Sequence, residues 1–528
     1  MKILISNAKI HSMDRFNSVY NSMIMENDRI IALGDYKELK MNISSKDIVW
    51  DADSRTIIPG MTDSHIHFLD YSLSLNEVSL RGVKSIEKCK EIIKEKVKDT
   101  KPGDWITGGG WDKSLWGDNF PNKDALDKAA PDNPVYLISK DCHTSWVNSL
   151  ALYKAKIDNE TFIEGGEIEK SKGELTGILK ENAQSLVKGI IPYPTENVIE
   201  DALMSGIQNS HSLGFTAVHS MSLQNDSSFN TLVNALRRIR DKDLLKLRFT
   251  LNPTLSIMEE IIRTGIGKDF KNDFMRLGAI KLFADGSLGS QSAWMTEDYI
   301  GRPGHKGMHI ECGKGLDENI RKSISLGFPV AVHAIGDRAN QEVLDIFEKC
   351  QLESKGLRHR IEHAQILCQK DIKRFATLGV IASVQPIHLL EDVDLINKFW
   401  GKRGRWAYPF QSLLNSGAVL TFGSDSPVED LNPFIGIYAA VSRQRVKDAT
   451  PFYKEEKVSV YDAIKAYTQS PAFATCDEII RGTLEQGKKA DFVILNKDVF
   501  TVAAESIKDI KVITTVVDGK VVYGDGMA

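Results

Sequence analysis

Two histidines near the start of the chain carry the first chemical signal. His65 and His67 lie in the segment Thr62–His67, and on a β-strand a spacing of two puts both imidazoles on one face. Neutral imidazole is the most frequent metal ligand in proteins. Alone, the pair is weak evidence for a metal site, because chance or a hydrogen-bonded core histidine explains it at least as well.

The position of the pair strengthens the metal interpretation. It follows residues 56–60 (TIIPG), an apolar run that we expect to be a barrel strand closed by Pro-Gly. Other expected strands end near further nitrogen and oxygen ligands, which are Lys281, His333, His363 and Asp425. Because α/β-barrel enzymes build their sites at the carboxyl ends of the strands, these five strand ends should converge on one metal site.

Lys281 allows two interpretations. A protonated ammonium has no lone pair for a metal ion, so the sequence alone favours an ion pair with Asp285 or another carboxylate. Reaction with CO2 would instead give a carbamate, whose two oxygens could bridge two metal ions.

The strands that must position these residues recur along the middle of the chain. Eight short apolar runs, most of them separated by enough residues for a helix, predict an α/β fold of the (β/α)8 TIM-barrel class. We expect this barrel over 59–477, with an insertion at about 85–200 over its mouth. The runs occupy 56–60, 215–219, 246–251, 278–283, 329–333, 358–362, 379–384 and 418–422.

Both ends of the chain have a different, β-rich pattern. Residues 2–10 and 22–33 alternate apolar and polar side chains, and Asn27-Asp28 is placed as a hairpin turn. The far end repeats the pattern, with Asp518-Gly519 between two strand-like runs. We therefore predict a small composite β-sandwich domain built from 1–58 and 478–528.

Three residues outside the five strand ends are candidates for substrate binding. His143 and Trp111 lie in the expected insertion, where Trp111, Trp116 and Trp146 either pack together or wall an apolar pocket. His219 ends an expected strand, so it either lines the pocket or forms a hydrogen bond in the core. The remaining histidines are expected to be structural or exposed to solvent: His11, His211, His305, His309, His359 and His388.

Composition narrows the class of protein. The 528 residues are 42% hydrophobic and 26% charged with a net charge of −4, which fits a globular enzyme and gives no footprint for nucleic acid or a membrane surface. The start lacks the pattern of a signal peptide, and the six cysteines form no CxxC pair. We expect a cytoplasmic enzyme with a small-molecule substrate, and a homo-oligomer stays open. The patterns GxxxxGK[ST], GxSxG and HExxH are missing.

As a set, the motifs resemble one family over nearly the whole chain. They are similar to the amidohydrolase superfamily, in the branch called amidohydrolase family 3, which includes N-substituted formamide deformylases. The resemblance implies a TIM barrel with a split β-sandwich domain. Its segments are IIPGMTDSHIHF, GGGWDKSLW, HTSWVNSLAL, IKLFADGSLGSQSAW, VAVHAIGDRAN, HRIEHAQ, TFGSDSPVEDLNP and GTLEQGKKADFVIL.

The resemblance also implies a pair of divalent metal ions. His65 and His67 would bind the first ion, and His333 and His363 the second. A carboxylated Lys281 would bridge them, which reverses the preference for an ion pair. Zinc is the first choice for these ligands, with manganese or iron as alternatives.

Asp425 is implied to contact the first metal ion and to handle the proton. The metal pair would lower the pKa of a bridging water, and Asp425 would accept a proton as the hydroxide attacks an amide carbonyl. The expected activity is hydrolysis of a carbon–nitrogen bond in a small molecule, such as an N-substituted formamide or an N-acyl amine. His143 and Trp111 match positions near the substrate in this family.

Departures from the family pattern concern the substrate pocket. Cys142 stands where glycine is common, Ser220 follows His219 where aspartate is common, and Gln291 replaces a frequent arginine. A cyclic-amide hydrolase stays open because ring opening uses the same metal chemistry, as does a non-catalytic binding protein on this fold. A deaminase is disfavoured, because the HxxE pattern of adenosine-type deaminases is missing at His333.

Overall fold

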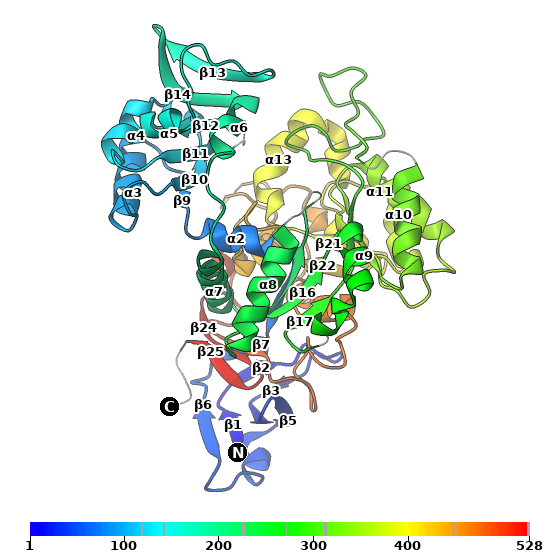
Figure 1. Cartoon of the computed structure of the whole chain (residues 1–528). Coiled ribbons are helices and arrows are strands. Elements are labelled where there is room, and N and C mark those ends of the chain that lie inside the picture. The colour runs from blue at the N-terminus through cyan, green and yellow to red at the C-terminus, as the bar shows by residue number, and fades with distance from the viewer. Residues whose placement is uncertain are drawn as a thin grey trace. The chain divides into compact units, whose positions relative to one another are not determined.

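The chain folds into two compact units. The computed structural model describes residues 1–117, 120–140, 143–223, 228–270, 272–310, 314–446 and 449–524. The first unit joins Met1–Tyr71 to Leu203–Ala528, and the second is the intervening segment Ser72–Ala202. Figure 1 labels the helices and strands of both.

Two parallel sheets form the centre of the first unit. One has the order β17-β16-β15-β8 and the other the order β18-β19-β20-β21-β22. Most of their side chains are buried, as expected for a parallel sheet with both faces covered. The strands are β8 (Met61–Ile66), β15 (Phe215–Met221), β16 (Arg248–Asn252), β17 (Met275–Leu277), β18 (Ile280–Phe283), β19 (Val330–Ala334), β20 (Arg360–His363), β21 (Ile381–Val384) and β22 (Leu420–Phe422).

Hydrogen bonding joins the two sheets at both edges. At one edge Thr254, just after β16, forms a parallel bridge with Lys281 of β18. At the other edge the backbone N–H of Asp425 donates to the carbonyl oxygen of His65 at 2.7 Å. The result is a TIM-barrel-like α/β fold in which the first and last strands end side by side.

Helices alternate with the parallel strands and bury one apolar side each. In α11, for example, Val343, Leu344 and Phe347 are buried at helical spacing. Among the described helices, none has the length and apolar character needed to cross a membrane. Those of the first unit and its boundaries are α2 (Phe68–Ser74), α7 (Glu196–Ser212), α8 (Ser228–Asp241), α9 (Leu255–Thr264), α10 (Lys314–Ser325), α11 (Asp337–Lys349), α12 (Ile372–Leu378), α13 (His388–Phe399), α14 (Phe410–Asn415), α15 (Pro433–Ser442), α16 (Val460–Tyr467) and α17 (Gln469–Ala474).

The prediction that 56–60 is the first barrel strand is wrong. Thr56–Pro59 forms β7, which pairs with β2 and β23 in a terminal sheet, and β8 begins directly after Gly60. A Cβ on Gly60 would lie 2.4 Å from the side chain of Thr216, so a larger residue does not fit where the chain changes sheets. One glycine between two apolar runs hides this boundary in the sequence. The other expected strands coincide with parallel strands.

Strands from both ends of the chain pair with each other. β7 and β23 are antiparallel neighbours in a sheet of order β25-β24-β23-β7-β2-β3, and a second sheet has the order β5-β4-β1-β6. The two sheets share an apolar cluster that includes Ile5, Met25, Ile57 and Phe492. The elements are β1 (Lys2–Ser6), β2 (Lys9–His11), β3 (Val19–Tyr20), β4 (Ser22–Glu26), β5 (Arg29–Gly34), α1 (Tyr36–Lys40), β6 (Ile48–Asp51), β7 (Thr56–Pro59), β23 (Phe492–Leu495), β24 (Val512–Val517) and β25 (Lys520–Gly524).

Both expected hairpin turns are present in these sheets. Glu26 pairs with Arg29 across the first turn, where Asn27 has a φ of 54°, and Asp518-Gly519 connects β24 to β25. Asparagine visits this left-handed region more readily than most residues. A Cβ on Gly519 would lie 2.0 Å from the carbonyl oxygen of Asn27, so the two turns pack directly against each other.

The second unit contains a six-stranded sheet of order β13-β14-β12-β11-β10-β9. Its bounds are wider than the insertion expected at about 85–200, and a location over the barrel mouth stays a prediction. Its core includes Trp111 and Trp146. The elements are β9 (Val78–Ser79), α3 (Ile86–Lys98), β10 (Ile106–Trp111), α4 (Lys123–Ala129), β11 (Val135–Ser139), β12 (Thr144–Val147), α5 (Ser149–Lys154), β13 (Gly166–Ser171), β14 (Glu174–Glu181) and α6 (Ser185–Lys188).

A buried ion pair ties β16 to the chain just before β23, and its loss should destabilise the first unit. Arg248 donates from Nε and Nη2 to the two carboxylate oxygens of Asp491 at 2.9 and 3.1 Å. The variant Arg248→Met leaves this buried carboxylate without its partner. We expect the free energy of unfolding in urea to fall by about 3–5 kcal/mol.

The matched control is Arg240→Ala, which breaks an exposed ion pair with Asp241 on the same unit. It should change the free energy of unfolding by less than about 0.5 kcal/mol. An Arg248→Met loss no larger than that of the control would contradict the assigned role of the buried pair.

Candidate metal centre

The ends of β8, β19 and β20 and the loop after β22 bring the predicted metal ligands together. The ring centroids of His65 and His363 lie 4.9 Å apart, those of His333 and His363 4.5 Å, and those of His65 and His67 5.7 Å. Asp425 follows β22 by three residues, and its Oδ1 lies 3.3 Å from Nε2 of both His65 and His67.

The carboxylate of Asp425 faces imidazoles on two sides. Its Oδ1 faces His65 and His67, whereas its Oδ2 lies 3.3 Å from Nε2 of His388. Burial acts to raise the pKa of Asp425, but the neighbouring imidazoles of His65, His388 and His67 outweigh it and hold the pKa well below its ordinary value. The φ of Asp425 is 60°, in the left-handed region that few residues other than glycine adopt and that is often found at functional positions.

Hydrogen bonds decide which nitrogen of each imidazole is available. A carbonyl oxygen only accepts, so the nitrogen that faces it carries the proton and the opposite nitrogen offers a lone pair. Burial, helped by the charge of Lys281, lowers the pKa of His333 to about 3, so this ring is neutral as a metal ligand must be. The pairs are His67 Nδ1 with Met221 O (3.1 Å), His363 Nδ1 with Gln385 Oε1 (2.8 Å) and His333 Nε2 with Gly286 O (3.1 Å).

Two groups of three side chains could each hold a divalent cation. They are His65, His67 and Asp425, and His363, His388 and Asp425, with the ligand atoms of each group within 4.8 Å of one another. Imidazole nitrogen and carboxylate oxygen suit zinc, manganese and iron. The donor set therefore fits the metal chemistry expected from the sequence, and the identity of the ligands stays a prediction.

His388 lies at the candidate metal centre, so the expectation that it is exposed to solvent is wrong, whereas the alternative of a structural role stays open. His388 is the first residue of α13, four positions after β21, and its side chain is 16% exposed. Its Nδ1 lies 3.8 Å from Oε1 of Glu429, while Nε2 faces Asp425. The available signal was its place in SVQPIH, close behind an expected strand.

Lys281 is buried beside the histidines, and an ion pair with Asp285 is not observed. Among the described residues Lys281 forms no ion pair at all, and burial lowers its pKa to about 8. The carboxylate of Asp285 instead accepts the backbone N–H groups of Ile335, Gly336 and Trp294 at 2.7–2.9 Å. The ion-pair interpretation with Asp285 is therefore wrong.

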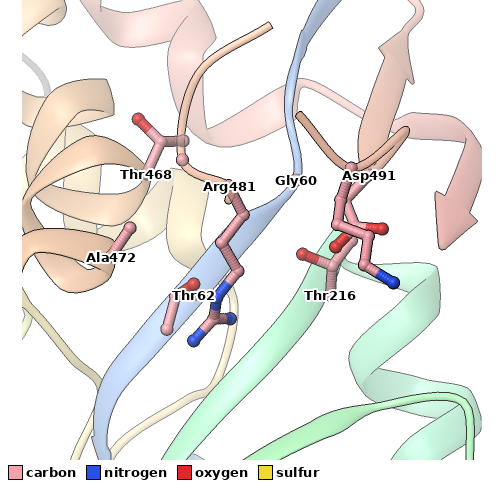
Figure 2. A pocket seen from close by; sticks show the side chains of 9 residues that line it. Gly60, Thr62, Thr216, Thr468, Ala472, Arg481 and Asp491 are labelled. Carbon is pink, nitrogen blue, oxygen red and sulfur yellow. The ribbon is translucent and has the colours of Figure 1, made fainter. Parts of the chain in front are cut away.

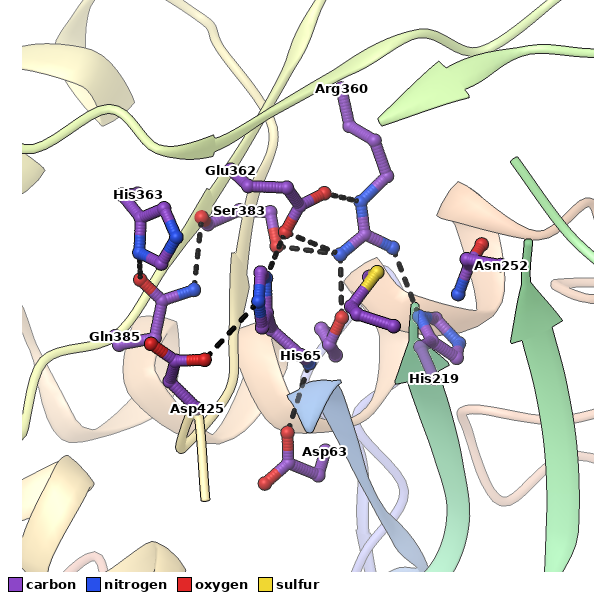
Figure 3. Close-up of polar contacts among 12 residues, drawn as sticks. Asp63, His65, His219, Asn252, Arg360, Glu362, His363, Ser383, Gln385 and Asp425 are labelled. Atoms are coloured by element: carbon purple, nitrogen blue, oxygen red, sulfur yellow. Dashed lines mark hydrogen bonds and ion pairs between the residues drawn. The ribbon is translucent and has the colours of Figure 1, made fainter. Parts of the chain in front are cut away.

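A buried ion pair lies directly behind His65 (Figure 3). Oε2 of Glu362 lies 2.6 Å from Nδ1 of His65, and Oε1 accepts the Nε–H of Arg360 at 2.5 Å. Neither Arg360 nor Glu362 was predicted from the sequence. Their spacing of two on β20, which puts two opposite charges on one face of a buried strand, was the available signal.

The three predicted substrate contacts lie in different environments. His219 is fully buried with Nδ1 facing the Arg360 guanidinium at 3.1 Å, which matches the alternative of a core histidine. Trp111 is 1% exposed and stacks on Trp116 in the core of the second unit, which matches the packing alternative. The His143 side chain is exposed. A substrate contact by any of the three stays a prediction.

Two of the three departures from the family pattern lie in the first unit near its strand ends. Ser220 is buried on β15, and Gln291 lies in the loop after β18 with a φ of 55°. The third, Cys142, lies outside the residues that the structure describes.

Two cavities lie at the amino-terminal ends of the parallel strands, away from the histidines. One of about 10 Å³ lies beside Gly60 (Figure 2) and has room for about one water molecule. In the other, of about 140 Å³, Arg276 and Arg481 both pair with Asp477 at 2.5–2.6 Å, which favours a structural role. Its basic lining residues are Arg248, Arg276, Arg481 and Lys489.

Comparison with known proteins agrees with this geometry. A model of the amidohydrolase family matches residues 49–523. Protein LONG AFTER FAR-RED 3 of Arabidopsis thaliana is 33% identical, over 99% of this chain and 91% of its own length. The N-substituted formamide deformylase of Arthrobacter pascens is 26% identical, over 99% of this chain and 98% of its own length.

The likeness extends to solved structures. An uncharacterized metal-dependent hydrolase of Pyrococcus furiosus matches with a TM-score of 0.77 and 29% identity, over 95% of this chain and all of that one. The family resemblance read from the motifs is thereby confirmed. The chain belongs to the amidohydrolase family and is a metal-dependent hydrolase of carbon–nitrogen bonds other than peptide bonds.

Proposed function

We propose that the protein hydrolyses the amide bond of a small molecule, an N-substituted formamide or an N-acyl amine. The observation that carries this proposal is the position of Asp425, whose two carboxylate oxygens face imidazoles on two sides at the ends of the parallel strands. The similarity to an N-substituted formamide deformylase over nearly the whole chain supports the substrate class.

The proposal includes two divalent metal ions, with zinc as the first choice. His65, His67 and Asp425 would hold the first ion, and His333 and His363 the second. When bound, such ions polarise a carbonyl group and lower the pKa of a water molecule towards neutrality. His67, His333 and His363 each turn one ring nitrogen to a carbonyl oxygen and leave the other for a metal ion, which supports this assignment.

Lys281 would supply the bridging group as a carbamate. Its burial, with no ion pair to any described side chain, favours the neutral amine, whose nitrogen can attack the carbon of CO2. A nitrogen–carbon bond forms, one C=O bond opens and one proton leaves the nitrogen. The product has one negative charge shared by two oxygens, which suits a position between two cations.

Asp425 would take a proton from the attacking water and return it to the departing amine nitrogen. His388 faces the second carboxylate oxygen at 3.3 Å and so fixes its orientation. Asp63 supports both strand ends, because its carboxylate accepts the backbone N–H groups of His65 and Ser424 at 2.9 and 3.1 Å.

We propose different roles in substrate binding for His143, Trp111 and His219, because their side chains differ in burial. His143 has an exposed imidazole that a ligand could reach. Trp111 and His219 are buried, so they would act by shaping the walls of the pocket rather than by broad contact with a substrate.

We also propose a closed (β/α)8 barrel over 59–477, a β-sandwich from 1–58 and 478–528, and the second unit over the barrel mouth. The backbone bonds between the parallel sheets and the core shared by the terminal sheets support the first two. Free thiols at Cys89, Cys350, Cys368 and Cys476 support a cytoplasmic location. We further propose that the substrate is a small molecule and that the protein has no nucleic-acid or membrane partner. The choice between a monomer and a homo-oligomer stays open.

A substrate screen tests the function directly. The metal-loaded protein is incubated with N-substituted formamides, longer N-acyl amines and cyclic amides, and the released amine or carboxylate is measured. We expect turnover of N-substituted formamides or N-acyl amines. Turnover of cyclic amides alone would replace the proposal with ring opening, and no turnover of any amide would contradict it.

Asp425→Asn should keep bound metal but lose about 10²–10⁴-fold in kcat, because the amide oxygen can still ligate but cannot take a proton. Metal content by mass spectrometry and steady-state kinetics check this. The control is Asp498→Asn, a carboxylate that lies near His11 in the terminal sheet and should leave kcat unchanged. Near-normal turnover in Asp425→Asn would refute the assignment.

Lys281→Ala should lose both metal and activity, with partial rescue by added acetate or propionate in place of the carbamate. In the wild-type apoprotein at one fixed concentration of dissolved CO2, activation by metal should be slower at pH 6 than at pH 8, because the amine is protonated below its pKa of about 8. Undiminished metal content in Lys281→Ala would show that the lysine carries no bridging group.

A further inference from the structure

We propose that the buried Arg360–Glu362 pair is a positioning device that orients His65 for the first metal ion. The inference rests on the proposed function and extends it to residues that do not touch the metal position. Both members of the pair lie on β20, and Arg360, Glu362 and His65 are each no more than 2% exposed.

The contact with His65 determines which nitrogen of that ring is free. Nδ1 of His65 lies 2.6 Å from Oε2 of Glu362, while Nε2 lies 3.3 Å from Oδ1 of Asp425. An ionised carboxylate only accepts hydrogen bonds, so the neutral ring carries its proton on Nδ1 and turns the lone pair of Nε2 towards Asp425 and His67. The opposite tautomer would put a proton where a metal ion must bind.

His65 differs from the other predicted ligands in the charge of its acceptor. His67 and His333 donate to backbone carbonyls and His363 to the amide of Gln385. Glu362 lies 2.6 Å from His65 Nδ1, within hydrogen-bond distance, whereas the carboxylate of Asp285 lies farther from His333 Nε2, at 3.7 Å. A charged acceptor strengthens the hydrogen bond and makes the ring a more basic ligand.

Arg360 fixes the carboxylate and is itself fixed from three other strands (Figure 3). Its guanidinium donates twice to Glu362, at 2.5 and 3.1 Å. It also donates to Ser64 O on β8 at 2.5 Å, to Ser383 Oγ on β21 at 2.6 Å and towards His219 Nδ1 on β15 at 3.1 Å. These contacts leave the carboxylate little freedom to turn away from His65.

The buried environment is consistent with an ionised Glu362. The Arg360 guanidinium donates to both oxygens of this carboxylate, and His65 Nδ1 lies 2.6 Å from one of them. A simple structural ion pair would have the same burial. What distinguishes the positioning role is a selective effect on one metal ion.

The experiment measures zinc affinity of the full-length apoprotein by competition with a chelating dye, together with thermal unfolding. Glu362→Gln should weaken binding of one of two zinc equivalents about 10- to 100-fold, because an amide N–H can face Nδ1 and favour the wrong tautomer. The matched control is Glu456→Gln, which alters another buried Glu–Arg pair, with Arg405, away from the histidines. The control should lose stability without a change in zinc affinity.

If Glu362→Gln does not fold, Ser383→Ala loosens Arg360 more gently and should still weaken one zinc equivalent several-fold. The positioning role is overturned if the variant that folds, Glu362→Gln or Ser383→Ala, binds zinc as tightly as the wild type. It is also overturned if the change in zinc affinity is no greater than in Glu456→Gln. A wild-type protein that binds no zinc, manganese or iron would instead contradict the proposed function, so the two failures are distinct.

Discussion

The carboxylate of Asp425 can face three imidazoles only because the first and last parallel strands end beside each other. The N–H of Asp425 donates to the carbonyl of His65 at 2.7 Å, and Asp63 holds the backbone of both strand ends. The left-handed backbone of Asp425 then turns its side chain towards the histidines. The candidate metal centre depends on this closure, since the histidines come from strands far apart in the sequence.

The interior beneath this centre holds several charged groups, and those of Arg360, Glu362 and Asp285 are paired. A buried charge is costly unless a partner and hydrogen bonds compensate it. Arg360 meets Glu362 and polar groups of three other strands, and Asp285 meets three backbone amides. Lys281 differs from them, because it is buried and forms no ion pair with any residue that the structure describes. An exception to a strong physical rule is expected where function rather than stability selects the residue.

Much of the fold and most of the predicted ligands followed from sequence patterns with a direct physical cause. Alternating or continuous apolar runs gave the parallel strands, and the residues just after them converge because parallel strands share one carboxyl edge. The boundary at Gly60 was missed because two apolar runs, one in each of two sheets, are separated by a single residue. Apolar patterning reports burial and does not say in which sheet a strand is buried.

The residues that sequence reasoning missed depend on distances across the fold. His388 lies behind an expected strand, but its role follows only from the 3.3 Å contact with Asp425. Arg360 and Glu362 look like an ordinary charged pair until His65 is seen against them. For Trp111 the sequence left packing and a pocket wall open, and its burial in the core of the second unit matches packing.

The most direct test of the central claim is anomalous X-ray diffraction from crystals of the zinc-loaded protein, recorded at the zinc absorption edge. The account predicts a peak about 2.0–2.2 Å from Nε2 of His65, Nε2 of His67 and a carboxylate oxygen of Asp425, with a second peak near His333 and His363. Peaks confined to other parts of the molecule, or no peak in zinc-loaded crystals, would contradict it.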